Sequence, residues 1–239
     1  MSTRASRPVL VACSHGTRSE SGAAAVAALA ESVRVAARGV EVIETFVDVQ
    51  EPALPAVVDA LRGRRAVVVP LLLSGGFHVH HDIARAVADR PAHVAAAPLG
   101  PHRAIVDVLV ARLVESGLRE DDVVVLGASA SSDSRAVADQ RATAAAVAHR
   151  LDRPVSLGHV GHCGSPLDEV VARVRRPGRR VVVASHLLAP GHFHDAIARA
   201  GADLATAPLL DGRAPDARLV DLVLERYAEA LGRDLAVAG

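Results

Sequence analysis

The chain alternates short, almost wholly apolar runs with longer Ala-rich segments in which apolar residues recur at helical spacing. Such apolar runs are typical of strands buried on both faces, and the amphipathic segments are typical of the helices that cover them. The predicted strands are residues 8–13, 40–47, 65–73, 93–97, 122–128, 154–159, 179–184 and 203–207. The predicted helices are residues 19–37, 53–62, 81–90, 101–116, 134–150, 166–175, 194–200 and 216–231. This alternation predicts an α/β protein built on parallel sheets.

The second half of the chain repeats the first in its order of elements and partly in its letters. The matched pairs are VLVACSHGTRS at 9–19 with VVVLGASASSD at 123–133, and VVVPLLLSGGFHVHHDI at 67–83 with VVVASHLLAPGHFHDAI at 181–197. Both pairs are 114 residues apart, whereas a chance likeness would drift. We therefore predict two homologous domains, 1–117 and 122–239, each a four-stranded parallel sheet flanked by helices. Their facing strand ends are expected to frame a cleft.

Composition narrows the classes of function. Half of the 239 residues are hydrophobic, mainly Ala, Val and Leu, and 27 basic residues, all Arg, balance 27 acidic ones. A neutral chain lacks the field that draws nucleic acid to a whole surface, so we expect no nucleic-acid partner. Two cysteines cannot form a disulfide framework, and no apolar run has the length of a signal peptide or membrane span. We expect a cytoplasmic protein without membrane contact, as a monomer or weak dimer.

Candidate chemistry gathers at three predicted strand ends of the first half. Residues 14–18 contain His15, Asp48 follows the second strand, and residues 74–78 end in His78. Ligands of open parallel sheets bind beyond the carboxyl ends of the strands, so these side chains are expected to share one edge. Two imidazoles and a carboxylate can hold a divalent metal ion while leaving coordination positions open.

Each of these residues also has a purely structural interpretation. Asp48 can cap the turn that follows its strand, and the pair Gly75-Gly76 can serve a tight turn alone. Cys13 lies at the end of an apolar strand and is expected to be a small core residue rather than a nucleophile. The other histidines of the first half, and His149, are expected to be surface residues or helix caps. Those of the first half are His80, His81, His93 and His102.

Taken together, three motifs resemble those of the sirohydrochlorin chelatases of the class II chelatase superfamily. SHGTR at 14–18 corresponds to the family's H-G-[ST]-R loop, and Phe46-Val47-Asp48 to its aromatic-aliphatic-acidic step. PLLLSGGFHVHHDI at 70–83 corresponds to P-x-x-L-x-x-G-x-H-V-x-x-D-[IL]. The resemblance covers both halves and implies a two-domain chelatase whose metal-handling, catalytic histidines are His15 and His78. The family's acidic helper falls on Asp48, where Glu is commoner.

The implied activity is insertion of Fe²⁺ or Co²⁺ into sirohydrochlorin, in siroheme or cobalamin biosynthesis, with Ni²⁺ belonging to a related branch. The enzyme would be an ATP-independent chelatase of the lyase class, with no prosthetic group and with the metal as a substrate. One neutral histidine would accept a pyrrole proton while the other holds the incoming ion. The residues expected to contact the carboxylate-rich tetrapyrrole are Ser14, Gly16, Thr17, Arg18, Gly75, Gly76 and Phe77.

The second half departs from this pattern, since Ala130 is expected to stand where the first half has His15. Its own histidines are either remnants of a lost site or an opposite wall that contacts the substrate; they are His159, His162, His186, His192 and His194. Two other classes of function stay open. A non-catalytic metal or tetrapyrrole carrier would bind the same ligands without forming product, and a regulatory or substrate-binding α/β module would not bind metal at all.

Overall fold

Two four-stranded parallel sheets form the centre of the computed structural model, which describes residues 7–76 and 78–237. The first sheet has the order β2-β1-β3-β4 and the second has the order β6-β5-β7-β8. The strands are β1 (Val9–Ser14), β2 (Val42–Phe46), β3 (Ala66–Pro70), β4 (His93–Ala95), β5 (Val123–Ser129), β6 (Val155–Val160), β7 (Val181–His186) and β8 (Leu204–Ala205). The predicted α/β class and the two similar sheets are confirmed.

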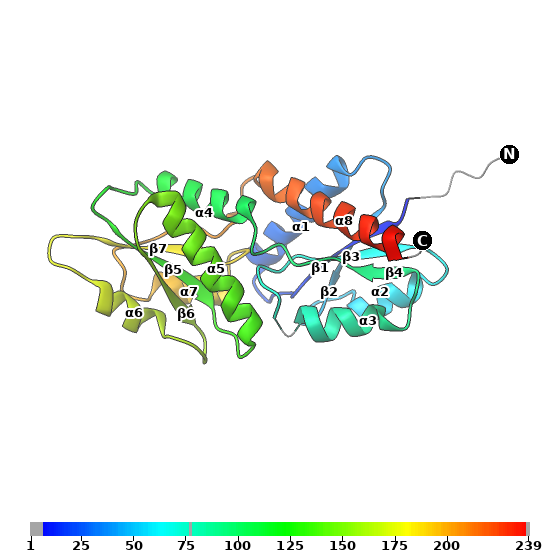
Figure 1. The fold of residues 1–239 in the computed structure, drawn as a ribbon, viewed down its shortest axis with the longest axis horizontal. Helices are drawn as coiled ribbons and strands as arrows, with labels where there is room; N and C mark the ends of the chain where they lie inside the picture. The colour runs from blue at the N-terminus through cyan, green and yellow to red at the C-terminus, as the bar shows by residue number, and fades with distance from the viewer. Residues whose placement is uncertain (1–6, 77, 238–239) are drawn as a thin grey trace.

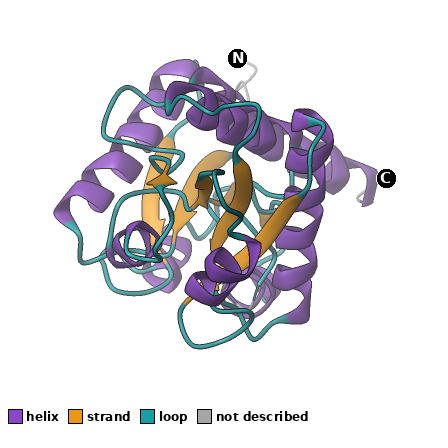
Figure 2. Cartoon of the chain, turned by 90° about the vertical axis from the view of Figure 1, so that its left-hand side faces the viewer, coloured by secondary structure: helices purple, strands orange, loops and turns teal. Residues whose placement is uncertain are grey.

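Helices cover both faces of the sheets, as an end-on view shows (Figure 2). They are α1 (Glu20–Ala36), α2 (Leu54–Ala60), α3 (Ala84–Ala88), α4 (Arg103–Glu115), α5 (Ser134–Leu151), α6 (Leu167–Val174), α7 (His192–Ala198) and α8 (Ala217–Val237). A π-helical turn, η1 (His78–Ile83), precedes α3. Within the described ranges, no helix combines the length and apolarity that a membrane crossing requires.

The central strands are apolar over most of their length because each of their faces meets a helical layer. Along β1, Leu10 and Ala12 enter one core, whereas Val9, Val11 and Cys13 enter another on the opposite face. Successive side chains of a strand point to opposite faces, so burial on both sides requires a continuous apolar run. This explains why the apolar runs located the strands.

The last helix of each repeat packs against the other repeat. Helix α4 follows the first sheet in sequence but contacts α5 and β7, while α8 contacts α1 and β3 of the first half (Figure 1). The two helices also contact each other. We propose 1–117 and 122–239 as the limits of the two repeats in the sequence. In space, each repeat gives its last helix to the other repeat.

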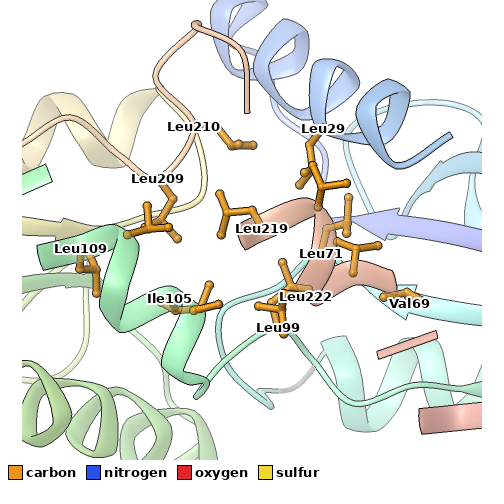
Figure 3. Packing of buried hydrophobic residues seen from close by; sticks show 14 of the residues in the cluster. Leu29, Val69, Leu71, Leu99, Ile105, Leu109, Leu209, Leu210, Leu219 and Leu222 are labelled. Atoms are coloured by element: carbon orange, nitrogen blue, oxygen red, sulfur yellow. The ribbon is translucent and has the colours of Figure 1, made fainter. Parts of the chain in front are cut away.

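One continuous hydrophobic core results from this exchange. The cluster includes Leu10 and Leu71 from the first half and Leu126 and Val182 from the second. Its middle part contains Leu29 from α1, Ile105 and Leu109 from α4, and Leu219 and Leu222 from α8 (Figure 3). Buried apolar surface shared in this way stabilises both sheets together.

Strand pairing corrects one detail of the predicted repeat. The last residue of β1 pairs with Phe46, which also makes a bridge to the residue before α2. In the second sheet His159 makes the equivalent bridge, to Pro166 before α6, and it pairs with Ala128, the residue before Ser129. Ser129 is therefore the counterpart of His15. The prediction that Ala130 stands there is wrong by one residue, but the second repeat still has no histidine at this point.

Candidate active site

The two predicted histidines of the first half lie against each other. His15 follows β1 and His78 opens η1 after β3, and these two strands are paired neighbours. The ring centroids are 4.6 Å apart and the ring planes meet at 88°, so one ring presents its edge to the face of the other. His15 is exposed and His78 is partly exposed. Two imidazoles are thus brought together at the carboxyl edge of the first sheet.

A tight turn at Gly16 places His15. Gly16 has φ +91, and a Cβ there would overlap the carbonyl oxygen of Asp48. The N–H of Asp48 donates to the carbonyl of His15 at 3.0 Å, and the N–H of Thr17 donates to Oε1 of Gln50 at 2.8 Å. The loop after β1 is therefore packed on the backbone after β2, and only glycine fits at its turn.

Asp82 orients His78. Nδ1 of His78 lies 2.7 Å from Oδ2 of Asp82, and Nδ1 of His81 lies 3.1 Å from Oδ1 of the same carboxylate. Burial raises the pKa of Asp82, but the hydrogen bonds and charges of His81 and His78 together outweigh it and hold this pKa below its usual value. The ionised carboxylate can only accept, so Nδ1 of His78 carries the proton and Nε2 has the lone pair.

Asp48 does not join this pair through any side-chain contact found among the described residues. Its exposed carboxylate accepts a hydrogen bond from the N–H of Val49 at 2.8 Å. The turn-capping interpretation of Asp48 thus has a structural basis. Its position at the end of β2 still leaves it on the same edge of the sheet as His15.

The predicted substrate-binding residues have different surroundings. Ser14 is buried, and its Oγ has no hydrogen-bond partner within the described part of the chain. Arg18 is exposed, Gly75 is buried and its N–H donates to Asp139, and Gly76 packs near Ala136. Phe77 lies outside the described residues. The N–H groups of Thr17 and Gly75 thus donate to side chains of the protein itself. Of the residues predicted to bind the substrate, Arg18 is therefore the one best placed to contact an anionic ligand.

Cys13 is a core residue, as expected. It is fully buried, and desolvation, followed by the charge of Asp82, raises the pKa of its thiol to about 12. A thiol with this pKa stays protonated near neutral pH and offers no thiolate to a metal or an electrophile. His102 caps α4, as expected. The expectation of a surface residue or helix cap is wrong for His93, which is buried in β4 and whose Nε2 donates to the backbone carbonyls of Leu61 and Arg64.

Among the described residues, no three His, Cys, Asp or Glu side chains are arranged to hold a metal ion together. The His15–His78 pair can therefore supply two nitrogen ligands and leaves the other coordination positions to non-protein groups.

The second repeat does not reproduce the pair. His186 is buried, its Nε2 has no partner in the described residues, and desolvation lowers its pKa to about 4. His159 hydrogen-bonds Gln140 at 3.0 Å, and His194 lies 3.2 Å from Oγ of Ser185. His162 and His192 are exposed. Buried histidines of this half serve packing and internal hydrogen bonds.

Sequence reasoning missed Asp82, Gln50 and Asp139. The spacing of four residues between His78 and Asp82 was a usable signal, because residues four apart share one face of a helix. The helix predicted for residues 81–90 excludes His78, whereas the structure begins η1 at His78. Gln50 and Asp139 act through backbone N–H groups distant in sequence, and no local pattern marks such contacts.

Two repeats of a helix-flanked parallel sheet, with paired histidines at neighbouring strand ends, define an α/β protein of the chelatase fold. The chain belongs to the CbiX family, whose sequence model matches residues 9–116 and again 123–230. A search of curated protein sequences finds no match.

Solved structures share the fold over nearly the whole chain. SirB from Bacillus subtilis with Fe³⁺ is 21% identical, with a TM-score of 0.79 and coverage of 94% of this chain and 95% of that chain. SirB from Bacillus subtilis subspecies spizizenii in complex with cobalt is 21% identical, with a TM-score of 0.74 and the same coverage. CbiX, the terminal enzyme for biosynthesis of siroheme in denitrifying bacteria, is 17% identical, with a TM-score of 0.66 and coverage of 93% of this chain and 99% of that chain.

Proposed function

We propose that this chain is a sirohydrochlorin chelatase, which inserts a divalent metal ion into the tetrapyrrole at the His15–His78 pair. The observation that carries the proposal is the meeting of these two rings at 4.6 Å on the carboxyl edge of the first sheet. Membership of the CbiX family supports it, as do the folds of SirB structures that contain Fe³⁺ or cobalt.

Metal insertion exchanges two pyrrole N–H protons for one divalent ion, so the site must hold the ion and remove protons. His78 suits the first task, because Asp82 fixes its ring and leaves Nε2 as the coordinating nitrogen. His15 suits the second. Its Nδ1–H donates to the carbonyl of Gly16 at 3.2 Å, and Nε2 is then the basic nitrogen. Protons accepted by the exposed His15 pass to solvent, and no nucleotide is required.

The tetrapyrrole carries several carboxylates, and Arg18 is the proposed contact for one of them. We assign Asp48 a weaker role, acting through water rather than as a direct ligand, because its carboxylate caps its own loop. The two imidazoles suit either Fe²⁺ or Co²⁺, because imidazole is a ligand for both ions. Supply of the ion then decides between siroheme and cobalamin synthesis.

The test is anaerobic absorbance spectroscopy with sirohydrochlorin and Fe²⁺, Co²⁺ or Ni²⁺ in separate reactions. The wild-type protein is expected to form metallated product well above the spontaneous rate. His15→Ala and His78→Ala are each expected to lose about a hundredfold or more in rate, since each removes a group in contact with the reacting atoms. His149→Ala is the control, because His149 is exposed at the far end of α5.

Near-normal rates in either active-site variant would remove that histidine from the mechanism. Wild-type protein that binds sirohydrochlorin and metal but forms no product above the spontaneous rate would be a carrier, and the proposed enzyme activity would be wrong.

A further inference from the structure

A hydrogen bond to a carboxylate joins the loop before His78 to the second repeat. The N–H of Gly75 donates to Oδ2 of Asp139 at 2.7 Å, although the two residues are 64 positions apart. Asp139 lies on α5, in the second turn of that helix. A backbone N–H bound to a carboxylate makes a shorter and stronger bond than one bound to a neutral acceptor. The bond fixes one point of the first-half loop on a helix of the second half.

The same loop lies on the first turns of α5. A Cβ built on Gly76 would be 3.4 Å from Cβ of Ala136 and 3.8 Å from Oγ of Ser131, which is ordinary contact distance. Ala136 is buried and lies one turn before Asp139. On the same face of α5, the small side chain of Ala136 therefore allows the loop of residues 75–76 to approach closely, and the carboxylate of Asp139 accepts its hydrogen bond.

This contact is linked directly to His78. The N–H of Val79 donates to the carbonyl of Gly76 at 3.1 Å, so the backbone on both sides of His78 is tied to the loop that Asp139 holds. The ring of His78 is fixed at its other end by Asp82 and faces His15. A shift of residues 75–76 would therefore displace the ring of His78 relative to that of His15.

The start of α1, which follows the loop of His15, also contacts the second repeat. A Cβ on Gly22 would overlap the carbonyl oxygen of Pro190, and one on Gly191 would lie 3.5 Å from Cβ of Ser19. The segments that carry the two histidines thus rest on separate elements of the second repeat, α5 and residues 190–191. Only the contact to α5 includes a charged hydrogen bond among these described neighbours.

We infer that Asp139 is a positioning residue for metal insertion: it holds the loop of residues 74–76 so that His78 stays in place against His15. This inference rests on the proposed function. It assigns the second repeat a part in the reaction even though that repeat has no histidine pair of its own. Active sites lose rate steeply when a reacting group moves by about 1 Å, so one bond at the base of a ligand loop is sufficient to matter.

The test compares Asp139→Ala with Asp139→Asn in the full chain. Asp139→Ala removes the acceptor and is expected to lower kcat for metal insertion about tenfold or more, with KM for sirohydrochlorin changed less than about twofold. Asp139→Asn keeps an oxygen that can accept from Gly75 and is expected to stay within about threefold of wild type. Amide hydrogen exchange of residues 71–76 is measured on the same proteins, and exchange is expected to be faster in Asp139→Ala alone.

The outcomes separate the two proposals. Wild-type protein that forms no metallated product would end the proposed function, while the exchange measurement would still judge whether Asp139 holds the loop. Unchanged kcat in Asp139→Ala, with or without a lower melting temperature, would show a merely structural contact and overturn the positioning role. An equal loss of kcat in Asp139→Asn would also overturn it, because the hydrogen-bond acceptor would then not be the cause.

Discussion

His78 takes its orientation from a residue four positions along the chain. Asp82 accepts hydrogen bonds from both His78 and His81, and its lowered pKa keeps it ionised across the neutral range. A carboxylate behind a histidine fixes the tautomer and the ring plane, and it makes the outer nitrogen a better metal ligand. The local device that prepares His78 is therefore contained within η1.

We expect Asp82→Asn to weaken Co²⁺ binding and to slow metal insertion by about ten- to a hundredfold, because a neutral amide holds the ring less firmly and donates less negative charge. The measurement is a Co²⁺ titration followed by visible absorbance, with single-turnover insertion on the same sample. Asp89→Asn, an exposed carboxylate at the end of α3, is the matched control. Equal Co²⁺ affinity in Asp82→Asn and wild type would show that Asp82 does not act on the ligand nitrogen.

At the scale of elements, the strands and the positions of the site loops could be predicted, whereas the local geometry could not. His15, Asp48 and His78 were placed at strand ends because apolar runs locate parallel strands and ligands bind beyond them. The strand predicted to extend to residue 73 ends at Pro70, and Leu71 continues into the core without extending the strand. The π-helical turn was missed since its wider spacing leaves no signature in apolar periodicity.

The turn at Gly16 gives a test of how strictly the first loop is built. Gly16 and Gly39 both have positive φ, but only at Gly16 would a Cβ overlap another backbone atom. Gly39→Ala is expected to cost about 1–2 kcal/mol of unfolding free energy, from the left-handed backbone alone. Gly16→Ala is expected to cost more and to move His15 away from His78, so that insertion is lost as well. Chemical denaturation measures the loss of stability, and the insertion assay measures the loss of activity. If Gly16→Ala were destabilised no more than Gly39→Ala and kept its activity, the clash with Asp48 would be contradicted.

At the scale of the whole molecule, the exchange of α4 and α8 was beyond sequence reasoning. An amphipathic pattern shows that a helix has an apolar face but not which of two similar sheets that face covers. The consequence is a shared core in which Leu71 of one half and Val182 of the other belong to a single cluster. We therefore expect the two halves to unfold in one transition rather than two, since neither sheet keeps its covering helices without the other.

This cooperative unit has a buried histidine that contributes to its response to acid. His186 follows Val182 and Ala184 on the face of β7 that enters the shared core, and desolvation lowers its pKa from 6.5 to about 4. Between those values the unfolded chain binds a proton that the folded chain does not. The contribution of His186 to stability is thus complete above pH 6.5 and falls as the pH drops toward 4, by about 1.4 kcal/mol per pH unit and about 3 kcal/mol in total.

His186→Leu is expected to remove this dependence. Leu187 and Leu72 accept equivalent hydrogen bonds from the N–H groups of Leu209 and Leu99, so the buried Leu71 is the counterpart of His186 and shows that leucine suits this position. Urea unfolding at pH 5, 6 and 7.5 should give a slope of stability against pH that is flatter than the wild-type slope by about 1 kcal/mol per unit below pH 6.5. Burial also lowers the pKa of His159 and His194, but these groups are present in both proteins and cancel in the difference. Parallel slopes in the two proteins would mean that His186 is not kept neutral by the shared core.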